Sequence, residues 1–149
     1  RGCLAQHGLV DRVAQVNVAQ SRLAGTLRGM HYQRTPHEEV KIVRCNRGAA
    51  FDVVLDLRPS SPSYTKWFGV ELSESNGRML YLPEGCAHGY QTLSDDAEVM
   101  YFTSAFYAPV AATGVRYDDP VFAIDWPRAV TAVSEQPAQG QASPFPMPV

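Results

Sequence analysis

Short runs rich in β-branched and aromatic residues alternate with turn clusters along most of this chain, and apolar residues recur with a period of two. The turn clusters are Asn46-Arg47-Gly48, Pro59 to Pro62 and Ser73 to Gly77. The runs predict strands over the ranges 13–18, 26–32, 40–45, 51–57, 67–72, 78–82 and 98–103. So many short strands at close spacing favour an all-β sandwich or jelly roll, whose interior can hold a ligand.

The two ends of the chain lack this period. Residues 1–12 carry the helix-like content and are predicted to form short peripheral helical structure. The segment 128–149, whose end is rich in Pro, Gln and Ala, is predicted to be an irregular tail. Because 149 residues with 45% hydrophobic content can bury one good core, we expect a single domain over 1–149.

Charge and hydropathy argue against two classes of partner. Thirteen Lys and Arg against fifteen Asp and Glu give a formal net charge of -2, which provides no broad cationic field for nucleic acid. Asp52 and Asp56 interrupt the longest apolar runs, so no stretch is long enough to cross a bilayer, and no signal peptide is visible. Three cysteines without metal-ligand spacing suit a reducing compartment. We therefore expect a cytoplasmic protein with neither nucleic acid nor membrane as partner.

The stretch from Gly25 to Lys41 is the first candidate for chemistry. It places Arg28, His31 and Lys41 in one predicted hairpin, where a guanidinium, an imidazole and an ammonium can converge on a small anionic molecule. Arg28 and His31 are three residues apart, so a regular strand would point them to opposite faces. A bulge at Gly29 would bring both side chains to one pocket.

A second motif, Pro83 to Gly89, presents His88 just after a turn of the kind that Pro and Gly impose. The remaining histidines, His7 and His37, lack such a context and are interpreted as structural. Asp118-Asp119-Pro120 reads either as an acid pair or as a capped turn.

Two further side chains have two readings each. Lys41 either extends from its apolar strand to solvent or faces the interior, where it would stabilise negative charge. Tyr101 is either a core aromatic residue or a phenol that faces His31.

The predicted strand 51–57 is amphipathic in an unusual way. Asp52, Val54 and Asp56 share one face, and the other face is wholly apolar. If the carboxylates face the interior, the apolar face must also be buried. We expect a covering layer or a second subunit on it.

Six motifs follow one another along the chain, in this order: Gly25 to Gln33, Lys41 to Cys45, Phe51 to Arg58, Leu82 to Gly89, Phe106 to Pro109 and Ile124 to Pro127. Together they resemble the dTDP-4-dehydrorhamnose 3,5-epimerase family over roughly 15–127. The resemblance implies a cupin-type double-stranded jelly roll and a homodimer built by exchange of N-terminal strands. It also implies action on a dTDP-4-keto-6-deoxyhexose without metal or organic cofactor.

The implied chemistry fits the polar residues. Protons on C3 and C5 of a 4-keto sugar lie next to the carbonyl, so a placed base can remove them if the enolate is stabilised. Inversion then needs a proton from the other face. The resemblance assigns the base to His31, the enolate stabiliser to Lys41 and the acid to Tyr101.

The resemblance also assigns supporting residues. It makes His88 a second active-site histidine, with Asp52 on the neighbouring strand as its carboxylate partner. The substrate-binding positions that it implies are Gln15, Asn17, Arg28 and Phe106, the last standing where the family commonly has tyrosine.

This sequence departs from the family pattern at both ends. The family has Ser-Glu-Lys-Asp where this chain reads Ser134 to Pro137, so the aspartate that orients the catalytic histidine is replaced by proline. Glu135 and Asp119 are candidate substitutes. Near the start, Arg1-Gly2 is interpreted as the remnant of a Glu-Arg-Gly-Phe-like segment.

Three functional hypotheses follow. The first is an epimerase that inverts C3, C5 or both carbons of a dTDP-4-keto-6-deoxyhexose in deoxysugar or cell-surface polysaccharide biosynthesis. The second is a non-catalytic sugar-nucleotide binder of the same fold, which the missing aspartate favours. The third is a metal cupin, since Pro83, Gly85 and His88 resemble the second cupin motif, although the His-x-His pair of the first motif is absent.

Overall fold

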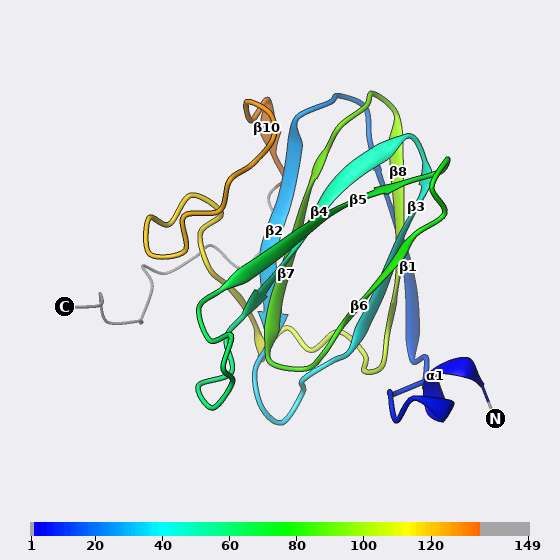
Figure 1. Ribbon diagram of the computed structural model, residues 1–149, viewed down its shortest axis with the longest axis vertical. Helices are drawn as coiled ribbons and strands as arrows, with labels where there is room; N and C mark the ends of the chain where they lie inside the picture. The colour runs from blue at the N-terminus through cyan, green and yellow to red at the C-terminus, as the bar shows by residue number, and fades with distance from the viewer. Residues whose placement is uncertain (1, 135–149) are drawn as a thin grey trace.

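The computed structural model describes residues 2–134, which form two β-sheets facing one another (Figure 1). A short helix, α1 (Cys3–Gln6), is followed by β1 (Gln15–Ser21), β2 (Thr26–Gln33), β3 (Lys41–Arg47), β4 (Ala49–Asp56), β5 (Trp67–Ser73), β6 (Met79–Leu82), β7 (Cys86–Thr92), β8 (Ala97–Thr103), β9 (Ala112–Gly114) and β10 (Ala132–Val133). The all-β prediction and the seven predicted strands are confirmed. The helix at the N-terminal end agrees with the predicted peripheral helical structure.

The first sheet has the order β1-β8-β3-β6, and all its neighbours are antiparallel. The second sheet has the order β10-β2-β7-β4-β5, with β9 also paired to β2. Successive strands alternate between the two sheets along much of the chain, as expected of a jelly roll. No helix in the described part is long and apolar enough to span a membrane.

Three strands were not predicted from the sequence, and β7 is the most instructive. Every residue of Cys86–Thr92 is buried, because β7 lies between β2 and β4 in the middle of the second sheet. A strand buried on both faces shows no alternation of polar and apolar residues, and this one has few β-branched residues to indicate it. The motif at Pro83 to Gly89 is thus a turn followed by the start of a central strand.

The prediction of an irregular segment from residue 128 onward is wrong at β10. Ala132–Val133 runs parallel to the start of β2 and is held by backbone bonds from Thr131 N to Gly25 O (3.1 Å) and from Ser134 N to Leu27 O (2.9 Å). Backbone pairing of this kind leaves no pattern in the side chains. The rest of the predicted tail, 135–149, lies outside the described residues.

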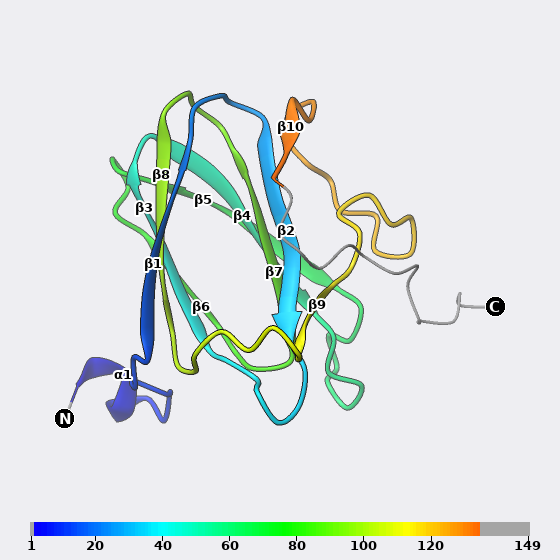
Figure 2. The same cartoon turned by 180° about the vertical axis from the view of Figure 1, so that it is seen from behind.

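The outer face of β4 is covered by the chain itself. Val53 and Leu55 are fully buried in a cluster with Phe122, and Phe51 meets Trp126 edge-on with ring centroids 6.5 Å apart. The covering residues come from the segment 115–126, which lies outside the second sheet (Figure 2). The predicted covering layer is therefore confirmed, and it is intramolecular on this face.

A close contact between two glycines shapes β2. The pairing of β2 with β7 shifts register between Arg28 and His31, which is the bulge that the sequence predicted at Gly29. Gly29 has φ +127°, and a Cβ atom placed on it would lie 2.5 Å from the Cα atom of Gly89. Only two glycines can bring the β2 and β7 backbones this close.

We expect Gly29→Ala to destabilise the protein by about 2 kcal/mol or more, because the new methyl group must displace the β7 backbone as well as occupy an unfavourable φ. Gly77→Ala is the matched control: Gly77 also has a positive φ, +60°, but nothing lies within 4 Å of the point that its new methyl group would occupy. It should cost about 1 kcal/mol. Urea unfolding of both variants measures the difference, and equal losses would contradict the importance of the close contact.

Candidate active site

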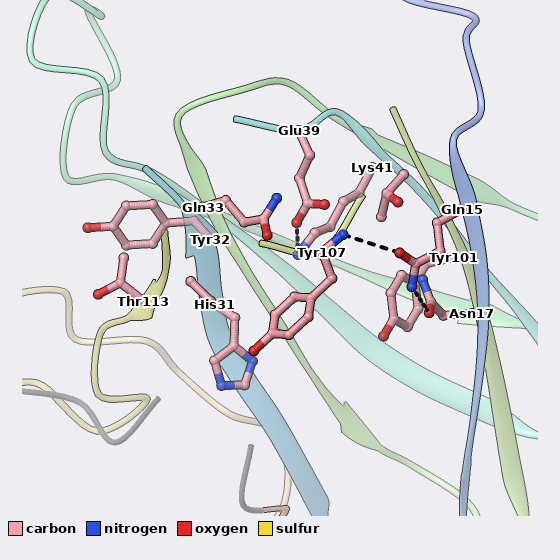
Figure 3. A pocket seen from close by; sticks show the side chains of 12 residues that line it. Gln15, Asn17, His31, Tyr32, Gln33, Glu39, Lys41, Tyr101, Tyr107 and Thr113 are labelled. Atoms are coloured by element: carbon pink, nitrogen blue, oxygen red, sulfur yellow. Dashed lines mark hydrogen bonds and ion pairs between the residues drawn. The ribbon is translucent and has the colours of Figure 1, made fainter. Parts of the chain in front are cut away.

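A cavity of about 340 Å³ opens between the two sheets and is lined mainly by polar side chains (Figure 3). A smaller cavity of about 70 Å³ adjoins it between the sheets. His31, Lys41 and Tyr101 line both spaces. We call the smaller one the inner cavity; its other lining residues are Ala19, Arg28, His88 and Tyr90.

The first sheet contributes the cation and the phenol. On β1 the polar residues Gln15 and Asn17 face inward while the valines face outward, and Asn17 pairs in register with Tyr101 of β8. Lys41 begins β3 with its side chain only 13% exposed. Its ammonium lies 3.2 Å from a Glu39 carboxylate oxygen, so the interior reading of Lys41 is correct.

The second sheet contributes the imidazole. The bulge at Gly29 sets both Arg28 and His31 facing the inner cavity, as predicted. Tyr101 lines the same cavity from the opposite sheet, which supports the reading in which its phenol faces the site. The candidate base and the candidate acid therefore approach a bound molecule from two sides.

The surroundings of His31 favour its neutral form. Burial lowers its pKa to about 4, and the electrostatic effects of Lys41 and of the neighbouring His88 act in the same direction. At neutral pH the imidazole is unprotonated and can accept a proton. Burial, assisted by the negative charge of Glu39, raises the pKa of Tyr101, which stays protonated and can donate one.

A buried pair supports the floor of the inner cavity. His88 Nε2 lies 2.9 and 3.1 Å from the two carboxylate oxygens of Asp52, which is fully buried on β4. This partnership between neighbouring strands agrees with the expectation from the sequence. His88 also pairs in register with His31, so the two imidazoles are cross-strand neighbours.

The Arg28 guanidinium is held by three acceptors. Nε donates to Ser21 Oγ at 3.3 Å, Nη1 to Ser134 Oγ at 2.8 Å and Nη2 to the Gln20 carbonyl at 3.0 Å. A guanidinium has more N–H groups than these three bonds use, so Arg28 is fixed in place with donors left for an anionic ligand.

Phe106 lies differently from its expected role. Its side chain is 71% exposed and does not line the cavity, whereas the next residue, Tyr107, does. Gln33 holds this loop: it donates to the Phe106 carbonyl (3.3 Å) and accepts from the Ala108 amide (2.6 Å). A further bond runs from the Tyr107 amide to Gln15 (3.2 Å).

Among the lining residues that were not predicted from the sequence are Gln33, Glu39 and Tyr107. Gln33 follows His31 by two positions on a strand, so strand periodicity could have placed it on the same face. Glu39 and Tyr107 lie in loops, where no periodicity applies, and no sequence signal indicated them.

Of the two candidate substitutes for the missing orienting aspartate, only Asp119 lies within residues 2–134. Asp119 accepts the Val121 amide at 3.0 Å, so the capped-turn reading of this segment is correct, and it makes no bond to His31. Glu135 and Pro137 lie outside the described residues. Also within residues 2–134, no three His, Cys, Asp or Glu side chains form a group that could hold a metal ion.

Two facing sheets that enclose a neutral imidazole, an ammonium, a phenol and a clamped guanidinium define a cupin-type jelly-roll protein equipped for proton transfer on an anionic small molecule. The particular family is shown by comparison with known proteins. The family model of dTDP-4-dehydrorhamnose 3,5-epimerase matches residues 2–143, and the chain belongs to this family.

Curated relatives agree with this assignment. The dTDP-4-dehydrorhamnose 3,5-epimerase of Sinorhizobium fredii is 42% identical over 146 residues, 98% of this chain and 73% of the relative. That of Escherichia coli K12 is 48% identical over 102 residues, 68% of this chain but only 55% of the relative. The chain thus spans between about half and three quarters of the length of these relatives.

Two similar solved structures contain ligands. The Bacillus anthracis dTDP-4-dehydrorhamnose 3,5-epimerase, with TDP and PPi bound, has a TM-score of 0.85 at 38% identity, and the match covers 88% of this chain and 75% of that one. The Legionella pneumophila dTDP-6-deoxy-D-glucose-3,5-epimerase, in complex with dTDP-4-keto-L-rhamnose, has a TM-score of 0.79 at 38% identity. That match covers 94% of this chain and 69% of the Legionella chain.

We expect Lys41→Met to raise the pKa of His31, because one of the positive charges that lower it is removed. The pKa should stay below 6.5, since burial is the larger cause. An NMR titration of the His31 ring measures both. Lys66→Met is the matched control: Lys66, the only other lysine, is exposed and lies outside the cavity, so its loss should leave the titration unchanged.

Proposed function

We propose that this protein is an epimerase of a dTDP-4-keto-6-deoxyhexose that inverts C3, C5 or both in deoxysugar biosynthesis. One observation carries the proposal: His31 and Tyr101 line one cavity from opposite sheets, and Lys41 lines the same cavity. Family membership and the ligands of the two solved structures support the substrate class.

The chemistry follows from the placement of these groups. Neutral His31 takes the proton from the carbon next to the C4 carbonyl, and the electron pair moves to the carbonyl oxygen to give an enolate. The Lys41 ammonium stabilises that oxyanion in the cavity between the sheets. The Tyr101 phenol then returns a proton to the same carbon from the other face, which inverts its configuration. The resulting imidazolium and phenolate exchange protons with solvent before the next turnover.

The outer part of the cavity suits the nucleotide. Arg28 lies at the inner cavity instead, where its guanidinium, held by three anchoring bonds, can bind an anionic group of the ligand. Gln15 and Asn17 are hydrogen-bonded to each other at 2.7 Å on the cavity wall and offer polar contacts. Tyr107 offers a ring face at the rim for the base.

The test is deuterium incorporation at C3 and C5 of a 4-keto-6-deoxy sugar nucleotide in D2O. We expect His31→Ala to lose at least about 100-fold in exchange rate, because the general base is gone, while dTDP binding is retained. His37→Ala is the matched control, since His37 is exposed and lies outside the cavity. Unchanged exchange in His31→Ala would overturn the assignment of the base.

One observation favours a second candidate function, a non-catalytic sugar-nucleotide binder. Within residues 2–134 the carboxylate-bound imidazole is His88, and His31 has no carboxylate partner. An imidazole without such a partner is less well oriented, and its protonated form is less stabilised. A wild-type protein that binds 4-keto sugar nucleotides but exchanges neither proton would establish the binder.

We also propose a homodimer formed through the outer face of the first sheet. Val16 and Val18 of β1 are 50% and 56% exposed, and each pairs in register with an apolar residue of β8, Phe102 or Met100. In a sheet with one face in solvent, apolar side chains usually face the core and polar ones face the solvent. On β1 the valines face outward and Gln15 and Asn17 face inward, which is the reverse. A second copy of the chain would bury this apolar face.

We expect the protein to remain dimeric at micromolar concentration by light scattering, with an interface of roughly 2,000 Å² or more. Val16→Lys/Val18→Lys should give a folded monomer, because two charges would be buried without partners. Exposed Leu23, replaced by Lys, is the control that should stay dimeric. A monomeric wild-type mass would contradict the proposal.

A further inference from the structure

The hydroxyl of Tyr90 is a buried polar group that the proposed mechanism does not use. Tyr90 lies on β7, its residue surface is only 3% exposed, and it lines the inner cavity. Among residues 2–134, no donor or acceptor reaches its oxygen, which is itself fully buried. Most buried hydroxyl groups in proteins have a hydrogen-bond partner, so this one calls for an explanation.

The residues paired in register with Tyr90 make hydrogen bonds to other groups and none to its hydroxyl. Asp52, the register partner of Tyr90 on β4, uses both carboxylate oxygens on His88. Arg28, its register partner on β2, is clamped by three other acceptors. The His88 ring lies 6.1 Å from the Tyr90 ring, centroid to centroid.

A phenylalanine would fill the same volume without the cost of an unsatisfied hydroxyl. No interaction in the ligand-free protein therefore explains why this residue carries a hydroxyl group. Burial raises the pKa of Tyr90, so the group keeps its proton and is available as a donor.

We propose that Tyr90 Oη donates a hydrogen bond to an oxygen of the hexose bound in the inner cavity, which makes Tyr90 a substrate-binding residue that recognises the sugar. This inference rests on the proposed function. His31, Lys41 and Tyr101, which act on the sugar ring in the proposed mechanism, line this cavity as well as the outer one. Because the anion-binding Arg28 lines it too, the measurement with dTDP alone separates a contact with the sugar from one with the diphosphate. At about 70 Å³ the inner cavity is also too small for a nucleotide, which the outer cavity of about 340 Å³ can receive.

The experiment compares Tyr90→Phe with the wild-type chain in three measurements. We expect kcat/KM for a 4-keto-6-deoxy sugar nucleotide to fall about tenfold, the loss typical of one hydrogen bond to a ligand. The Kd of dTDP alone should stay within about twofold, since no nucleotide contact is removed. The melting temperature should be unchanged or higher, because an unsatisfied hydroxyl has been deleted.

Tyr81→Phe is the matched control. The Tyr81 hydroxyl has a protein partner, the Val10 amide at 3.2 Å, and lies outside both cavities. Its removal should lower stability slightly and leave kcat/KM unchanged.

The outcomes separate this proposal from the proposed function. Unchanged kcat/KM in Tyr90→Phe, or a lower melting temperature, overturns the role of Tyr90 while the epimerase proposal stands. If the wild type binds dTDP-hexoses but does not catalyse proton exchange, the epimerase proposal is overturned. The sugar contact is then still supported if Tyr90→Phe loses affinity for a dTDP-hexose but keeps its affinity for dTDP. If the wild type binds no sugar nucleotide, both proposals fall.

Discussion

The contact between Gly29 and Gly89 is the constraint on which the site depends. It allows β2 to approach β7 more closely than side chains permit, and the resulting shift in register turns Arg28 and His31 to the same face. Without the shift, strand geometry would send one of them to the outer side of the sheet, under the segment 115–126. The anion-binding group and the base thus share a cavity because two residues have no side chain.

The electrostatics of the cavity serve both the resting protein and the reaction. Burial lowers the pKa of His31, Lys41 adds to this effect, and in the proposed mechanism the same ammonium stabilises the enolate. Glu39, at 3.2 Å, balances the ammonium in the absence of ligand and adds to the effect of burial, which raises the pKa of Tyr101. Lys41 of the first sheet thus affects the pKa of His31 in the second sheet, and Glu39, which precedes β3, affects the pKa of Tyr101 on β8.

Much of this arrangement could be predicted from the sequence, and the failures have physical causes. Alternation revealed the strands with one solvent-facing side, and the spacing of Arg28 and His31 predicted the bulge. The alternation of polar and apolar residues could not reveal β7, which is buried on both faces, or β10, which is held by backbone bonds. Loop residues were harder still: Tyr107 lines the cavity in place of Phe106, because the path of the loop is set by distant glutamine side chains.

The bond between Ser134 and Arg28 has a consequence for biosynthesis on the ribosome. Arg28 belongs to the second strand of the chain, yet one of its three anchors is supplied more than a hundred residues later. A nascent chain that has emerged only as far as β8 has the strands of both main sheets but lacks the segment that pairs with β2 and steadies the guanidinium. The anion-binding group is therefore completed late in synthesis, after the framework that surrounds it.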